Sequence, residues 1–191
     1  MLEKLFELYP HLFGAQFLPL KLGIFHELLT RHPEHFDRIG LKAALGVHTR
    51  STRYLQSIAA QRQRYDLDRA AVESVAPEHV YQALVELFRR RQVRSSEDLR
   101  PKLRAQLMKA FETSGLTRQE YLGRVVGKDA AINTLLEEAL AEHAQLLAKQ
   151  EALRGAFESS GKTIAEFAQM YGVDPANVRV AVELQRRPGN T

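Results

Sequence analysis

Residues 44–55 read ALGVHTRSTRYL, and this stretch decides how the first half of the chain folds. Apolar residues at helical spacing precede a polar block, residues 48–53, and the apolar pattern resumes directly after it. Such spacing is typical of amphipathic helices, and a hydroxyl residue before a resumed pattern is typical of a helix N-cap. We therefore predict that one helix ends at Val47 and that a second helix begins with Thr49 as its N-cap.

The predicted start of the second helix is rich in groups that bind anions. A helix N-terminus carries unpaired amides and a partial positive charge, so it binds phosphate readily. Thr49 and Ser51 add hydroxyl donors. Arg50 and Arg53 add guanidinium groups that bind phosphate through two hydrogen bonds, and Tyr54 adds a ring for stacking. The alternative interpretation is an ordinary capped helix with exposed arginines.

The neighbouring residues predict a mainly α-helical domain with a small β hairpin. The segment RYDLD alternates and is rich in strand formers, so we expect a strand of the hairpin at residues 64–68. Asp37 is a suitable N-cap, and Pro19 and Pro77 suit a first helical turn. Besides the two helices already described, we predict helices over residues 2–13, 19–31 and 77–92.

Composition excludes several classes of protein. The 191 residues include no cysteine, which excludes disulfides and thiolate metal sites and suits a reducing cytoplasm. There is no apolar run of membrane-spanning length, and the N-terminus lacks the pattern of a signal peptide. We therefore predict a cytoplasmic protein that does not span a membrane.

The basic excess lies in the first half of the chain. Residues 1–94 contain 14 Lys/Arg and 10 Asp/Glu, whereas residues 95–191 contain 13 of each. Within residues 38–69 only two acids accompany seven basic residues, which are Arg38, Lys42, Arg50, Arg53, Arg62, Arg64 and Arg69. Concentrated positive charge of this kind predicts a site for a polyanion, although a solvated basic face would look the same in composition.

The second half contains an internal repeat. AFETSGLTRQEYLGRVVGKDAA, from Ala110, resembles AFESSGKTIAEFAQMYGVDPA, from Ala156. Thr117 with Glu120 and Thr163 with Glu166 form predicted capping boxes. We expect two units of helix, tight turn and helix, at about 103–142 and 149–187. Within them, Gly127 and Gly172 are expected to close a helix in the left-handed conformation, Asp129 and Asp174 to cap the next, and a helix over residues 130–154 to join the units.

Three motifs of the first half occur in a fixed order: PLKLGIF, LKAALGVHTRSTRYL and RYDLD. Together they resemble the RNA-binding domain of the ProQ/FinO family of bacterial RNA chaperones, over about residues 2–92. The resemblance implies a FinO-like α/β RNA-binding domain at residues 1–94, followed by an all-α helical-hairpin repeat region at residues 95–191. The family pattern has Gly after Asp-Leu-Asp, where this chain has Arg69.

The resemblance also implies a ligand and a site. Members of the family bind the 3′ terminator-type hairpins of small RNAs and mRNAs with their U-rich tails, stabilise them and promote RNA–RNA pairing in post-transcriptional regulation. Thr49, Arg50 and Ser51 match the pocket for the terminal 3′ nucleotide, and His48 takes a place that is often Tyr. The remaining matches are the basic or aromatic positions Lys21, Arg38, Lys42, Arg53, Tyr54 and Arg64. The predicted RNA-binding set is completed by Arg62 of the basic segment.

Nothing in the sequence predicts catalysis, a metal or a cofactor. We find no Ser/His/Asp order, no glycine-rich phosphate loop and no paired acids in an apolar setting. His32 and His35 lack a nearby third ligand. Two alternatives to the RNA chaperone stay open. One is a protein–protein adaptor that acts through residues 95–191, and the other is a DNA-binding regulator that uses the second repeat.

Overall fold

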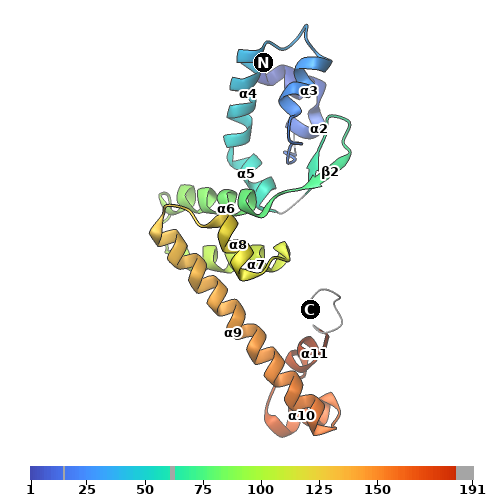
Figure 1. Ribbon diagram of the computed structural model, residues 1–191, viewed down its shortest axis with the longest axis vertical. Coiled ribbons are helices and arrows are strands. Elements are labelled where there is room, and N and C mark those ends of the chain that lie inside the picture. The colour runs from blue at the N-terminus through green and yellow to red at the C-terminus, as the bar shows by residue number, and fades with distance from the viewer. Residues whose placement is uncertain (15, 61–62, 184–191) are drawn as a thin grey trace. The chain divides into compact units, whose positions relative to one another are not determined.

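The computed structural model describes residues 1–14, 16–60 and 63–183. This part of the chain is mainly α-helical and contains one two-stranded antiparallel sheet, which confirms the predicted fold class (Figure 1). The chain forms two compact units, Met1–Leu135 and Leu136–Thr191. The predicted domain boundary at residue 94 falls inside the first of these units.

The elements follow one another with short connections. The helices and strands of the first unit are α1 (Leu2–Leu8), α2 (Pro10–Phe13), α3 (Ile24–Arg31), α4 (Arg38–Arg50), α5 (Thr52–Ala59), β1 (Gln63–Tyr65), β2 (Ala71–Ser74), α6 (Pro77–Gln92), α7 (Arg100–Ser114) and α8 (Arg118–Val125). The remaining helices are α9 (Ala130–Ser160), α10 (Ile164–Tyr171) and α11 (Pro175–Glu183). None of the helices in the described ranges is long and apolar enough to cross a membrane.

The junction between α4 and α5 lies two residues later than the sequence predicts. Thr49 belongs to the last turn of α4, where its hydroxyl donates to the Leu45 carbonyl at 2.8 Å. Ser51 is the N-cap of α5, and its hydroxyl accepts a hydrogen bond from the Tyr54 amide at 3.2 Å. The predicted cap at Thr49 is therefore wrong, because the Thr49 hydroxyl bonds back into the preceding helix and only one extended residue separates the two helices.

The start of α3 also differs from the prediction. The helix begins at Ile24 rather than near Pro19. The intervening segment pairs with β1: the Lys21 amide donates to the Tyr65 carbonyl at 2.9 Å, and the Tyr65 amide donates to the Pro19 carbonyl at 2.8 Å. Pairing with a strand distant in sequence thus overrides the local helical signal of the proline.

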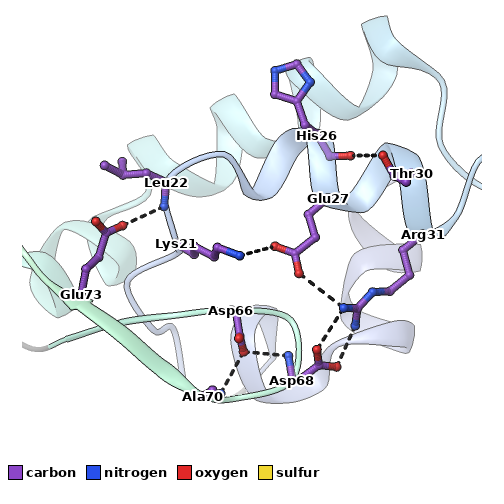
Figure 2. A network of polar contacts seen from close by, with 10 residues as sticks. All are labelled: Lys21, Leu22, His26, Glu27, Thr30, Arg31, Asp66, Asp68, Ala70 and Glu73. Carbon is purple, nitrogen blue, oxygen red and sulfur yellow. Dashed lines mark hydrogen bonds and ion pairs between the residues drawn. The ribbon is translucent and has the colours of Figure 1, made fainter.

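The hairpin is present, but its first strand is shorter than predicted. β1 ends at Tyr65, and residues 66–70 form the turn to β2. One Asp66 carboxylate oxygen accepts hydrogen bonds from the amides of Asp68 and Ala70, both at 2.9 Å (Figure 2). Arg69 has a φ of 67°, the left-handed conformation that glycine adopts most easily. The turn therefore forms without the glycine of the family pattern.

α6 is the central packing element of the first unit. It contacts α5, α7 and α8, which lie around it (Figure 1). Its buried residues are Val80, Tyr81, Ala83, Leu84, Val85 and Leu87. The predicted bounds of this helix, residues 77–92, are confirmed. Because α7 and α8 cover part of α6, the first repeat unit packs directly onto the predicted RNA-binding domain.

The repeat has the predicted internal architecture. Both capping boxes are present, at Thr117 with Glu120 and at Thr163 with Glu166. α9 covers and extends beyond the predicted joining helix, and Gly172 ends α10 with a φ of 63°. The prediction for Gly127 is wrong, since the positive-φ residues of the described chain do not include it and α8 ends at Val125 with Val126 as its C-cap.

Candidate nucleic-acid interface

α4 and α5 together present a surface without negative charge. From residue 38 to residue 59 the chain contains no Asp or Glu. The exposed cationic side chains of these helices, which we call the basic surface, are Arg38, Lys42, Arg50 and Arg53. Two of them lie against aromatic rings: the Arg38 guanidinium is 5.9 Å from the Phe25 centroid, and that of Arg53 is 5.3 Å from the Phe17 centroid. Cation–π contacts of this kind orient the guanidinium groups at the surface.

A pocket of about 820 Å³ opens within the first unit, and we call it the central pocket. Its walls come from α3 and the segment before it, from α4, α5, β1 and α6, and from the start of α9 and the connection that precedes it. Most of the lining is apolar, which is typical of sites that hold a small organic ligand. Four residues of the predicted RNA-binding set line it, although they are distant in sequence: Lys21, Thr49, Tyr54 and Arg64.

Tyr54 and Arg64 build one wall of the central pocket. Both are 6% exposed, and both bind the backbone of Leu20. The Leu20 amide donates to the Tyr54 hydroxyl at 3.1 Å, and Arg64 Nη1 donates to the Leu20 carbonyl at 2.9 Å. Arg64 Nη2 also lies 3.0 Å from His79 Nδ1. Burial raises the pKa of the Tyr54 hydroxyl, so it stays protonated. These two side chains therefore fix the backbone around the pocket.

His48 lies in the core beneath the α4–α5 junction. It is 2% exposed, and its ring centroid is 4.7 Å from that of Phe13, 4.4 Å from that of Phe17 and 5.2 Å from that of Tyr54. Burial lowers the pKa of the His48 imidazole to about 4, so the ring is neutral at physiological pH. Neither ring nitrogen has a hydrogen-bond partner among the described residues. The structure thus places His48 among aromatic side chains, away from the surface where we expected it.

The α5 N-terminus contacts a cation that sequence reasoning missed. Arg90 of α6 donates from Nη1 to the Arg50 carbonyl at 2.9 Å and to the Thr52 hydroxyl at 3.3 Å. Its Nε donates to Glu86 at 2.8 Å. The sequence signal is the run of three arginines at the end of α6, but only packing brings Arg90 to this junction. Ser51 uses its hydroxyl for the cap, and Arg62 lies outside the described residues.

Lys21 lines the central pocket. It also begins a chain of alternating charges (Figure 2). Its ammonium is 3.1 Å from Glu27, which also contacts Arg31 at 3.4 Å. Arg31 in turn binds Asp68 of the hairpin turn at 2.7 Å and holds the pKa of the Asp68 carboxyl below its usual value. The chain ties α3 to the hairpin, and Glu27 offsets part of the Lys21 charge.

The predicted residues thus fall into three places. Lys21, Thr49, Tyr54 and Arg64 meet at the central pocket, the four cations of the basic surface follow α4 and α5, and His48 is in the core. The described residues contain no group of three His, Asp or Glu side chains that could hold a metal ion. Cations clustered along a helix or one face are a feature of nucleic-acid-binding proteins.

Comparison with known proteins identifies the family. The model of the ProQ/FINO family matches residues 1–100, and the chain belongs to this family. The match ends at Arg100, the first residue of α7, so the predicted repeat units lie outside it.

The curated relatives are similar over part of their length. The RNA chaperone ProQ of Idiomarina loihiensis is 41% identical over 63 residues, which is 32% of this chain and 30% of that protein. The RNA chaperone ProQ of Shewanella oneidensis is 36% identical over 84 residues, which is 42% of this chain and 39% of that protein. The chain thus matches less than half the length of these relatives.

Among solved structures, the crystal structure of a FinO-like RNA chaperone from Neisseria meningitidis is 28% identical to the chain. The alignment covers 50% of this chain and 84% of that one, with a TM-score of 0.38.

Proposed function

We propose that the protein is an RNA chaperone that binds 3′ hairpin ends of small RNAs and mRNAs, together with their single-stranded tails, and promotes RNA pairing. The observation that carries the proposal is the meeting of Lys21, Thr49, Tyr54 and Arg64 at the central pocket. Membership of the ProQ/FINO family and the RNA chaperone names of the relatives support it.

The central pocket suits the end of a single strand. Its apolar walls can accept a base and ribose, the Thr49 hydroxyl lines it, and Lys21 at its edge can bind a phosphate in exchange for Glu27. A terminal nucleotide can enter a pocket that a continuing chain cannot pass through. The size and lining of the pocket therefore favour a free strand end, and the family resemblance supports assigning it to the 3′ end.

The basic surface suits the hairpin stem. Side chains do not reach base edges in the deep, narrow major groove of A-form RNA, so duplex RNA is recognised through its shape, phosphates and 2′-hydroxyls. Arg38, Lys42, Arg50 and Arg53 offer cations along two successive helices. On this model the stem contributes affinity without sequence preference, and the tail in the central pocket contributes specificity for the 3′ end.

The test is a competition at fixed salt concentration. Fluorescence anisotropy would compare a hairpin that carries a free 3′ tail with the same hairpin blocked by a 3′ phosphate, with single-stranded RNA and with duplex DNA. We expect the free-ended hairpin to bind about tenfold more tightly than each competitor, the range of one lost charge-assisted contact. Equal affinity for all four ligands would mean that binding is nonspecific and electrostatic, and it would contradict the proposal.

Two substitutions separate the parts of the site. Lys42→Ala on the basic surface should lower the salt slope of hairpin binding by about one and keep the preference for a free end. Lys21→Ala should reduce that preference. Lys4→Ala is the matched control, because Lys4 lies on α1 and pairs with Glu7 at 3.0 Å. The pairing activity is a separate measurement, in which the protein should accelerate annealing of two complementary RNAs.

Protein binding through the second repeat is a second candidate function. In α10 and α11 three apolar side chains are exposed, Met170 and Tyr171 at 59% each and Val180 at 47%. Tyr171 corresponds in the repeat to Val125, which is only 5% exposed in α8, a helix that packs on α6. The equivalent surface in the second repeat is thus available to a partner helix. Tyr171→Ser should abolish self-association or partner binding in sedimentation analysis if this surface is used.

A further inference from the structure

One wall of the central pocket comes from outside the family domain. The connection between α8 and α9, residues 126–129, is here called the α8–α9 turn. Three of its residues, Gly127, Lys128 and Asp129, line the pocket that Lys21 and Tyr54 also line. The family match ends at residue 100, so the predicted RNA-binding set includes no residue of this turn.

The α8–α9 turn is held in place by hydrogen bonds and an ion pair. The Asn133 side chain accepts from the Gly127 amide at 3.3 Å and donates to the Gly127 carbonyl at 2.9 Å. The Asp129 carboxylate accepts from the Ile132 amide at 3.2 Å and binds Arg89 of α6 at 2.7 Å. The position of Lys128 relative to α6 is therefore set before a ligand arrives, which lowers the entropy lost on binding.

Charge balance singles out Lys128 among the exposed cations that line the central pocket. The other lining cation without an acidic partner, Arg64, is buried and binds the Leu20 carbonyl and His79. The lining acids are neutralised, since Glu86 pairs with Arg90 at 2.8 Å and Asp129 pairs with Arg89. Lys21 pairs with Glu27. Lys128 is exposed, and its ammonium makes no ion pair or hydrogen bond with any residue in the described ranges. An uncompensated cation at the edge of a largely apolar pocket attracts an anion.

We propose that Lys128 is an RNA-binding residue and that it binds a phosphate of the single-stranded 3′ tail in the central pocket. The inference rests on the proposed function, which supplies the tail. A volume of about 820 Å³ accommodates a drug-sized ligand, such as about one or two nucleotides, and excludes a duplex. The contact is therefore to the tail and not to the stem. The first repeat unit completes the RNA site that the family domain begins.

The experiment uses the full chain and four proteins: wild type, Lys128→Ala, Lys128→Gln and the control Lys102→Ala. Lys102 is an exposed lysine of α7 that does not line the central pocket. Each protein is titrated with a hairpin that carries a uridine tail and with the same hairpin lacking the tail. Melting curves establish that the variants are folded, which we expect because the Lys128 side chain is exposed.

We expect both Lys128 variants to bind the tailed hairpin about five- to tenfold more weakly, with a salt slope lower by about one, and to bind the tailless hairpin like wild type. Lys102→Ala should change neither affinity. Wild-type affinity for the tailed hairpin in both Lys128 variants would overturn the inference and leave the proposed function intact. An equal loss for both hairpins would also overturn it, because the contact would then be to the stem. If wild type itself does not prefer the tailed hairpin, the proposed function fails, and this inference fails with it.

Discussion

At the scale of single residues, His48 couples stability to pH. Its folded-state pKa of about 4 lies below the ordinary histidine value of 6.5, because burial disfavours the charged ring. The unfolded chain therefore binds more protons between these values. The stability that the neutral ring contributes is complete above about pH 6.5 and is lost as the pH falls toward about 4.

His48→Phe tests this coupling, because it keeps an aromatic ring among Phe13, Phe17 and Tyr54 but removes the titrating group. Between about pH 7.5 and pH 5, wild type should lose about 2 kcal/mol more unfolding free energy than the variant. Urea unfolding at the two pH values measures the difference. Parallel losses in the two proteins would mean that His48 is protonated in the folded state.

Arg69 provides a second prediction at this scale. Its left-handed φ of 67° is strained for a residue with a Cβ, and the Asp66 hydrogen bonds hold the turn in that conformation. Arg69→Gly should raise the unfolding free energy by about 0.5–1 kcal/mol, since relief of strain exceeds the greater entropy of glycine in the unfolded chain. Arg69→Ala removes the charge and keeps the Cβ, so it should not be stabilising. A glycine variant no more stable than the alanine variant would contradict strain in the turn.

At the scale of elements, the packing of α8 against α6 buries a hydroxyl without a partner. Tyr121 is 0% exposed, and its hydroxyl has no hydrogen-bond partner among the described residues. Burial raises the pKa of this hydroxyl to about 12. Tyr121→Phe should therefore raise the unfolding free energy by about 1 kcal/mol, because it removes an unsatisfied polar group.

Tyr54→Phe is the matched control for the Tyr121→Phe prediction. The Tyr54 hydroxyl is also buried, but it accepts a hydrogen bond from the Leu20 amide at 3.1 Å. Its removal should lower the unfolding free energy by about 1 kcal/mol. Thermal or urea unfolding measures both changes. A higher unfolding free energy for Tyr121→Phe and a lower one for Tyr54→Phe would support an unpaired Tyr121 hydroxyl. Equal destabilisation would show that the Tyr121 hydroxyl has a partner in solution.

At the scale of the whole molecule, the first unit is larger than the family domain. α7 and α8 bury apolar residues against α6, among them Leu103, Leu107 and Tyr121. A chain of residues 1–94 lacks these contacts. Its unfolding free energy should therefore be at least about 2 kcal/mol lower than that of a chain of residues 1–135. Urea unfolding of both chains checks this. Equal stability would mean that the family domain does not depend on the first repeat unit.

Removal of residues 95–191 also tests their part in RNA binding. Because residues 95–191 carry no net charge, a chain of residues 1–94 should keep most of the hairpin affinity of the full chain. The zero net charge of residues 95–191, however, does not exclude a local contact between Lys128 and RNA. If Lys128 contributes as proposed, the shorter chain binds the tailed hairpin more weakly and the tailless hairpin with little change.

Much of the fold could be predicted from the sequence, because many of its signals are local. Asp37 caps α4, Pro77 starts α6, and both capping boxes act within three or four residues of the backbone they satisfy. The family motifs and the lack of acidic residues from α4 to α5 are likewise visible in contiguous stretches of sequence. These features determined the helices, the repeat and the cationic character of the first unit.

Only the tertiary structure decided where the candidate site residues lie. His48, Tyr54 and Arg64 look like surface groups in the sequence, yet packing buries all three. Arg90 reaches the α5 N-terminus from 40 residues away, and Lys128 joins a pocket with residues of α3 and α4. Contacts between distant segments depend on which apolar faces pack together, and no local pattern encodes that choice. Sequence therefore determined the elements and their charge, and packing decided which side chains remain available to a ligand.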